Sequence, residues 1–176
     1  MVRWGCIPAP SEDMQHPARN TDELWRELSR TGQDRAPYEC WERYRRDQIA
    51  IDDLRRVICR LWSATEFPCR TLPRWVWLDW FRATGFVSDC DRSAPTHPIE
   101  VWRAQVKYPI GLAWSTCRER AWGLYERNAH EFGHPARLLR GFVKPSTVLA
   151  LVRDRGQVAV LADPRGRFWK VVRQNR

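Results

Sequence analysis

The feature that most limits the possible folds is a change of residue pattern at the loop SAPTHP, residues 93–98. Before this loop, apolar side chains recur every three or four residues, which is the period of an amphipathic helix. After it, the chain consists of short apolar or alternating runs separated by Gly or Pro, which is typical of strands. The sequence therefore predicts an α+β protein, in which a helical amino-terminal part precedes a compact β core with one intervening helix.

The chain is expected to divide into an irregular Pro-rich arm, a helical part and a β-rich core, over residues 1–20, 21–97 and 98–176. Three helices are predicted in the helical part, over residues 22–30, 37–63 and 73–85. Asn20, with Glu23 at the third position after it, resembles a capping box at the start of the first helix. The aromatic side chains of the third helix are expected in the core rather than on a base-stacking surface: Trp75, Trp77, Trp80 and Phe81.

The β-rich core is expected to hold six strands, over residues 99–106, 111–116, 137–144, 147–154, 157–163 and 167–172. One helix, over residues 118–131, separates the second of these strands from the third. We find no internal repeat and no low-complexity tract in the sequence.

The chain carries a formal net charge of +9 and has a sequence pI near 9.8. An excess of this size favours an anionic partner, most often nucleic acid or the phosphates of a nucleotide. The alternative is an Arg-rich coding bias, because acidic residues are interspersed throughout and no unbroken basic run occurs. The first residues lack an apolar run as long as that of a signal peptide, and no segment could span a membrane. A cytoplasmic protein with no membrane partner is therefore expected.

Six cysteines occur without a C-x-x-C pair and are expected to be reduced and mostly buried. A pattern typical of zinc peptidases, H-E-x-x-H, runs from His130 to His134. Gly133 weakens a helix there, and Pro135 disfavours helical geometry at His134. A third ligand is also hard to place, since the remaining histidines lie upstream in loops: His16 and His97. A helix terminus is favoured, and a zinc hydrolase is kept as a minor alternative.

Arg103 lies in the middle of the predicted strand VWRAQV, where a charged side chain among Val and Trp needs a reason. The next strand ends in Trp114, Ser115 and Thr116 and leads into the predicted helix. A strand, a basic loop and a second strand follow in VKPSTVLALVRDRGQVAVLADP. This order resembles the ADP-ribosyltransferase superfamily, in its Arg–Ser–Glu branch, over residues 99–164.

The resemblance implies that the chain binds NAD. Arg103 would hold the NAD phosphate and the nicotinamide-side ribose, and Ser115 with Thr116 would brace the nicotinamide half of the pocket. Trp114 and Tyr125 would pack beside the nicotinamide, or else belong to the core. For Arg103 the alternative is a structural role, as a sheet-edge residue or in an ion pair with Glu100 or a later Asp.

The last motif of the family is Gln or Glu, any residue, then the catalytic Glu. In RGQVAVLADP the first position is Gln157 and the catalytic position is Ala159. No Glu occurs after Glu131, and the nearest acids lie toward the ends of the strand: Asp154 and Asp163. Because side chains alternate along a strand, we expect Ala159 to face a cleft beside Arg103 and Ser115.

Three explanations of Ala159 remain open. An original Glu has been replaced, or the protein is a naturally degenerate member that binds NAD without transferring, or the likeness is accidental. Under the first two, the native-type activity is that of a mono-ADP-ribosyltransferase, and this chain is inactive as it stands. Under the third, the leading alternative is a non-enzymatic, basic nucleic-acid-binding protein.

The acceptor is expected to be a macromolecule. Gln157 stands where the family contacts the acceptor, and the neighbouring Arg153 and Arg155 favour nucleic acid, RNA or DNA, over an acidic protein. The Trp and Arg side chains of the amino-terminal helices are further candidates for stacking on unpaired bases. By family analogy alone, the setting implied is a bacterial or phage conflict system, such as a toxin with an antitoxin partner.

Overall fold

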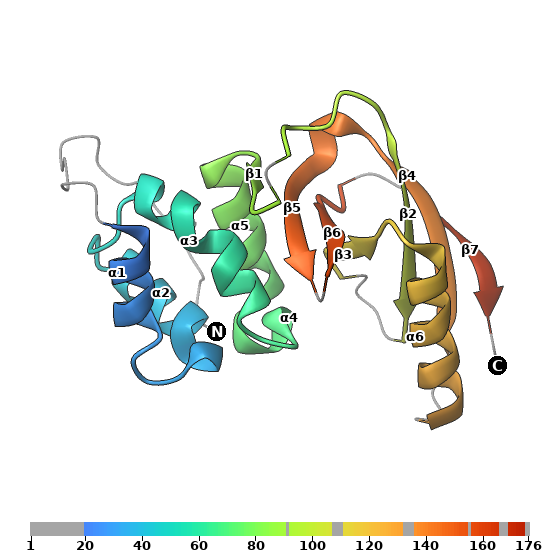
Figure 1. The fold of residues 1–176 in the computed structure, drawn as a ribbon, viewed down its shortest axis with the longest axis horizontal. Coiled ribbons are helices and arrows are strands. Elements are labelled where there is room, and N and C mark those ends of the chain that lie inside the picture. The colour runs from blue at the N-terminus through green and yellow to red at the C-terminus, as the bar shows by residue number, and fades with distance from the viewer. Residues whose placement is uncertain are drawn as a thin grey trace, which may run out of the picture. The chain divides into compact units, whose positions relative to one another are not determined.

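The structure is a computed structural model that describes residues 20–90, 92–106, 111–131, 136–154, 156–165 and 169–174. The chain divides into two compact units, residues 1–84 and 85–176. Helices occupy the first unit, and strands with one long helix occupy the second (Figure 1). The predicted α+β class, with its helices mainly amino-terminal, is therefore confirmed. The expected arm at residues 1–20 lies, except for Asn20, outside the described residues.

The first unit contains five described α-helices: α1 (Thr21–Leu28), α2 (Ala36–Tyr44), α3 (Ile51–Ser63), α4 (Pro68–Thr71) and α5 (Arg74–Thr84). A 3₁₀ turn, η1 (Gln33–Arg35), precedes α2. Asn20 caps α1 as predicted, since its side-chain oxygen accepts a hydrogen bond from the backbone N–H of Asp22 at 2.9 Å.

The helix predicted over residues 37–63 is wrong as a single element, because it is divided into α2 and α3. At the end of α2 the N–H of Gln48 donates to the carbonyl of Arg43, and that of Asp47 to the carbonyl of Tyr44. This bond pair is a Schellman motif, which requires a left-handed residue, and Asp47 takes that place with φ of 55°. The signal was missed because Gly is the usual residue at this position.

The core of the first unit is aromatic. Trp77 lies edge-on to Trp62 at 5.0 Å and to Trp80 at 5.6 Å between ring centroids. Trp77, Trp80 and Phe81 are fully buried, as expected for α5, whereas Trp75 is exposed. The tryptophans of this unit therefore serve mainly as packing groups rather than as a base-stacking surface.

The second unit is one seven-stranded sheet over the described residues, in the order β1-β5-β6-β3-β2-β4-β7. The strands are β1 (Val87–Ser88), β2 (Ile99–Gln105), β3 (Ala113–Ser115), β4 (Arg137–Val143), β5 (Val148–Asp154), β6 (Gln157–Ala162) and β7 (Trp169–Gln174). The remaining elements are α6 (Arg118–Glu131) and the 3₁₀ turn η2 (Pro145–Thr147). All six predicted strands and the predicted helix are present, and β1 is an addition.

The second unit begins at Gly85, earlier than the expected division at residues 97 and 98. The reason is β1, which pairs in parallel with β5, so that Val87 lies opposite Ala150. The carboxylate of Asp89 also accepts a hydrogen bond from the backbone N–H of Arg153 at 2.7 Å. The segment after Gly85 is therefore bound to the sheet.

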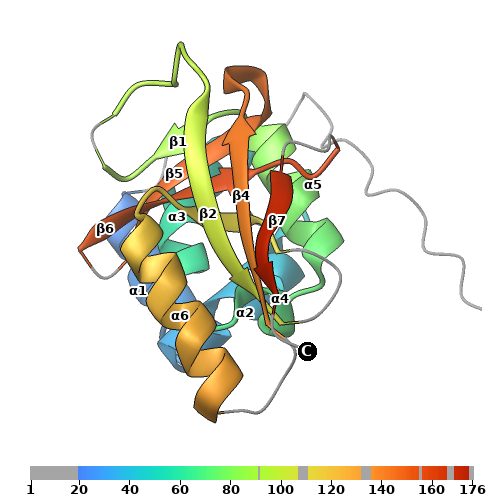
Figure 2. The same cartoon turned by 90° about the vertical axis from the view of Figure 1, so that its right-hand side faces the viewer.

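Each face of the sheet has its own apolar cluster. The inner-face cluster includes Val101, Trp114, Leu139, Leu151 and Val160, which come from five different strands. These strands can share one cluster because β5 and β6 cross behind β2 and β4 at a large angle (Figure 2). On the outer face α6 packs against β2. The apolar cluster between α6 and the sheet comprises Trp102, Ala121, Tyr125, Ala136 and Leu138.

Candidate ligand-binding site

One row of directly paired residues crosses six strands of the sheet. It runs from β5 through β6, β3, β2 and β4 to β7, over Val152, Ala159, Ser115, Trp102, Arg140 and Lys170. Directly opposed residues in antiparallel strands point to the same face of a sheet. Because Trp102 packs against α6, this row belongs to the outer face.

Ser115 and Ala159 are neighbours in this row, as the resemblance requires of its second and third motifs. Ser115 is half-buried, and its Oγ accepts from the N–H of Cys117 at 3.0 Å and donates to the carbonyl of Cys117 at 3.1 Å. Thr116 is exposed, and its hydroxyl donates to the carbonyl of Val158 at 3.5 Å. Ala159 is half-buried and places only a methyl group beside Ser115.

Arg103 is one residue beyond Trp102 on β2, so its side chain leaves the sheet on the inner face, opposite to Ser115 and Ala159. Its Nε donates to Oε1 of Gln105 at 2.8 Å, and its Nη1 donates to the carbonyl of Ala113. The guanidinium also covers Gly111, where an added Cβ would collide with it. The structure thus brings Ser115 and Ala159 together but directs Arg103 elsewhere.

The two aromatic candidates lie in the core. Trp114 is 2% exposed in the inner-face cluster, and Tyr125, a residue of α6, is 5% exposed in the cluster between α6 and the sheet. These exposures match the core alternative for both residues. The expected acceptor-contacting residue, Gln157, is exposed at the start of β6. Arg153 is also exposed, whereas Arg155 lies outside the described residues.

Asp163, which follows β6, does not replace the missing Glu. It is buried, and its carboxylate accepts from the backbone N–H of Arg165 at 3.0 Å and from Nε of Arg165 at 2.9 Å. Hydrogen bonding and charge from Asp163 raise the pKa of Arg165 above its usual range. The Asp163 carboxylate therefore stabilises the turn between Asp163 and Arg165.

In the part of the chain that the structure describes, no group of three His, Cys, Asp or Glu could hold a metal ion. The structure therefore adds no support for the zinc alternative. His130 is exposed in the last turn of α6, which is described as far as Glu131. The rest of the motif, residues 132–135, and His16 lie outside the described residues. His97 is exposed, with its Nδ1 at 2.9 Å from the hydroxyl of Thr96.

A group of side chains that the sequence did not single out surrounds Trp102 on the outer face. The guanidinium carbons of Arg118 and Arg140 lie 5.5 Å and 5.3 Å from the Trp102 ring, within cation–π range. Arg140 also lies 5.6 Å from the ring of Phe142 and forms an ion pair with Glu100. We call Glu100, Trp102, Arg118, Arg140 and Phe142 the outer-face cluster. A sequence signal exists only in part, in the Arg-x-Phe alternation of β4.

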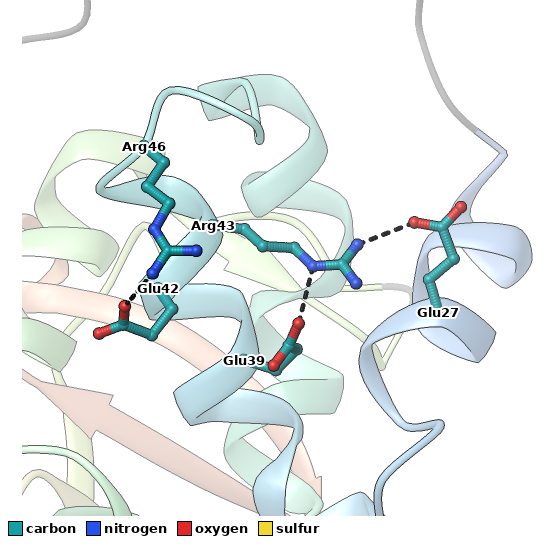
Figure 3. Close-up of polar contacts among 5 residues, drawn as sticks. All are labelled: Glu27, Glu39, Glu42, Arg43 and Arg46. Carbon is teal, nitrogen blue, oxygen red and sulfur yellow. Dashed lines mark hydrogen bonds and ion pairs between the residues drawn. The ribbon is translucent and has the colours of Figure 1, made fainter.

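The positive charge is concentrated in the second unit. Residues 1–84 contain 14 Arg or Lys and 13 Asp or Glu, whereas residues 85–176 contain 16 and 8. In the first unit several arginines also face acids directly: Arg43 contacts Glu27 and Glu39, and Arg46 contacts Glu42 (Figure 3). The β unit should therefore attract an anionic partner more strongly than the helical unit does.

Neither a protein-family model, nor a curated protein, nor a solved structure matches this chain. Among the described residues, no helix is both long and apolar enough to cross a membrane.

Proposed function

We propose that the β unit is an NAD-binding domain of the ADP-ribosyltransferase type that lacks its catalytic carboxylate at position 159. The observation that carries the proposal is the direct pairing of Ser115 with Ala159 across β3 and β6. The strand of the remaining motif, β2, is the other neighbour of β3. Motifs separated by tens of residues thus lie on three adjacent strands, which a chance succession of short motifs would not require.

The residues fit NAD in part. Ser115 and position 159 share a face, and the hydroxyl proton that Ser115 gives to Cys117 could reach a carboxylate at 159 instead. Arg103 does not fit as it lies, because it is bound to Ala113 and Gln105 on the other face. To hold the NAD diphosphate beside Ser115, Arg103 would have to give up both contacts, and its side chain would also have to reach the opposite face of the sheet.

When bound, NAD supplies a glycosidic bond whose cleavage releases nicotinamide and builds positive charge on the ribose. A carboxylate at 159 would stabilise that charge, and the acceptor nucleophile would bond to the ribose C1′ and lose its proton. With the methyl group of Ala159 in this place, the charge would have no carboxylate beside it. The present chain would then bind NAD but would transfer little or no ADP-ribose.

The test is transfer of labelled ADP-ribose from NAD into the RNA, DNA and protein fractions of a cell lysate by Ala159→Glu. The matched control is Gln157→Glu, which adds the same charge to the same strand and face two residues away. We expect label only with Ala159→Glu, mainly in nucleic acid. Circular dichroism shows whether each variant is folded, and NAD should raise the Tm of the unmodified chain. Equal labelling by both variants, or no labelling and no NAD effect on Tm, would contradict the proposal.

A second candidate function is nucleic-acid binding without NAD chemistry. It is favoured by the charge excess of residues 85–176 and by the position of Arg103 on the inner face. It predicts oligonucleotide binding that weakens steeply with salt, together with no effect of NAD on Tm. The toxin–antitoxin setting stays a proposal tied to the first candidate, and growth arrest on expression of Ala159→Glu would support it.

A further inference from the structure

We propose that the outer-face cluster, together with Lys170, binds single-stranded nucleic acid, with Phe142 as the base-stacking group. As a surface for the acceptor strand of a transferase, this inference rests on the proposed function. The binding itself does not, because it requires neither NAD nor a carboxylate at 159.

One large aromatic ring on this face is uncovered. Phe142 is 52% exposed, although a side chain of its size is usually buried in a small protein. α6 packs against the end of β2 that carries Ala104. In Figure 2 the opposite end of β2 and the end of β4 beside it lie clear of α6. Phe142 belongs to this second end, since it is paired with Glu100 near the start of β2. An exposed ring presents a π-face on which any base can stack.

Fixed positive charge lies beside that ring. Arg140 lies between the rings of Phe142 and Trp102, and Arg118 lies over the same Trp102 from the first turn of α6. Trp102 is itself buried under α6, so it positions the two guanidinium groups and is not a stacking group. Lys170 extends the charge along the sheet, because it is exposed and is the pairing partner of Arg140 on β7.

An exposed aromatic group next to Arg and Lys is the combination by which proteins bind unpaired strands, with bases on the ring and phosphates on the cations. This face belongs to the unit that holds nearly all of the net charge, so the long-range field favours the same anionic partner.

Glu100 allows a specific test of the proposal. Its carboxylate forms an ion pair with Arg140, and both side chains are about 40% exposed. A phosphate would compete with this carboxylate for Arg140. Removing the charge of Glu100 should therefore strengthen binding, which a purely structural ion pair would not do.

The experiment measures fluorescence anisotropy of labelled 12-nucleotide oligo-U and oligo-dT between 50 and 200 mM salt with the unmodified chain and single variants. Phe142→Ala should weaken binding roughly 5- to 150-fold, the loss typical of one stacked base. Arg140→Gln should weaken binding and reduce the slope of log K against log salt by about 0.7, the value for one phosphate contact. Glu100→Gln should tighten binding.

The helical unit offers matched controls. Phe67 is 50% exposed and has Arg70 at 4.5 Å over its ring, which is the same kind of pair in a nearly neutral unit. Phe67→Ala and Arg70→Gln should leave the affinity unchanged. The proposal is overturned if these controls weaken binding as much as their counterparts, or if no oligonucleotide binds at 50 mM salt.

Two further outcomes also overturn it. Equal affinity for a duplex, with no effect of Phe142→Ala, would mean a surface for the phosphate backbone alone. Equal affinity for poly-glutamate would mean a general anion surface. Because the unmodified chain is used, a failure here is distinguishable from a failure of Ala159→Glu to transfer label.

Discussion

Ser115 and Ala159 lie directly opposite each other, although they are 44 positions apart in the chain. Opposed residues in antiparallel strands have Cα atoms about 4.5–5.5 Å apart, which is within the range that a disulfide bridges. The double variant Ser115→Cys with Ala159→Cys should therefore form a cross-strand disulfide under mild oxidation. Mass spectrometry of a non-reduced digest identifies the linked peptides.

The matched control for this pairing is Ser115→Cys with Val158→Cys. Val158 immediately precedes Ala159 on β6, but its side chain leaves the opposite face of the sheet. This pair should not link. Linking of the control pair in preference to the first would mean that the register of β3 and β6 is shifted by one residue.

Arg103 and Gln105 provide a prediction about stability. A half-buried hydrogen bond to a charged group contributes about 1.5–3 kcal/mol. Arg103→Ala and Gln105→Ala should each lower the free energy of unfolding by about 1.5–3 kcal/mol. The double variant should lose less than the two losses combined, since one interaction is removed in both. Urea unfolding of the four proteins measures this coupling.

The same variants separate the two roles considered for Arg103. A structural role lowers the Tm of Arg103→Ala without NAD. If the Tm without NAD is unchanged and the NAD-dependent rise in Tm is lost, Arg103 is instead a ligand-binding residue.

The Schellman motif at the end of α2 predicts a stabilising substitution. Asp47 has φ of 55°, a region that Gly adopts freely and that β-branched residues avoid. Asp47→Gly should raise the free energy of unfolding by about 0.5–1 kcal/mol, and Asp47→Val should lower it by more than 1 kcal/mol. Urea denaturation measures both values. The opposite order would mean that α2 does not end in a left-handed residue.

Cys40 predicts a pH dependence. Burial raises the pKa of its thiol far above the usual range, whereas in the unfolded chain the thiol titrates near 8.5. As the pH rises past that value the unfolded state loses its proton and the folded state does not. The contribution of this thiol to the free energy of unfolding is therefore fully present below pH 8.5. Above that pH the contribution decreases by about 1.4 kcal/mol per pH unit.

Chemical denaturation between pH 7.5 and pH 9.5 checks this contribution. The free energy of unfolding should decrease more steeply with pH for the unmodified chain than for Cys40→Ala, while the difference between the two proteins stays constant below pH 8. Parallel curves over the whole range would show that Cys40 does not remain protonated in the folded state.

The sequence was sufficient for elements whose pattern is local. Asn20 marked the start of α1, and the alternating runs located six strands, because caps and side-chain period are properties of neighbouring residues. Two features of the fold were not predicted. β1 has only two residues, and the break between α2 and α3 depends on an Asp in a place that usually holds Gly.

The candidate site was predictable only in part, because it depends on register. The motif order was enough to place Ser115 beside Ala159, but the facing of Arg103 follows from the pairing of Trp102 with Ser115. A shift of one residue would move Arg103 to the other face, and no local pattern fixes that choice. The outer-face cluster was missed for a related reason, since α6 and two separate strands contribute to it.

The order of the strands in the sheet has a consequence for synthesis on the ribosome. β1 and β3 are made before their partners β5 and β6, which begin only at Val148 and Gln157. Until these two hairpin strands emerge, β3 has a hydrogen-bonding edge without its later partner, and β1 has no sheet to join. The nascent chain therefore carries unpaired strand edges from the synthesis of β1 until that of β6, and a chaperone would be needed most in this interval.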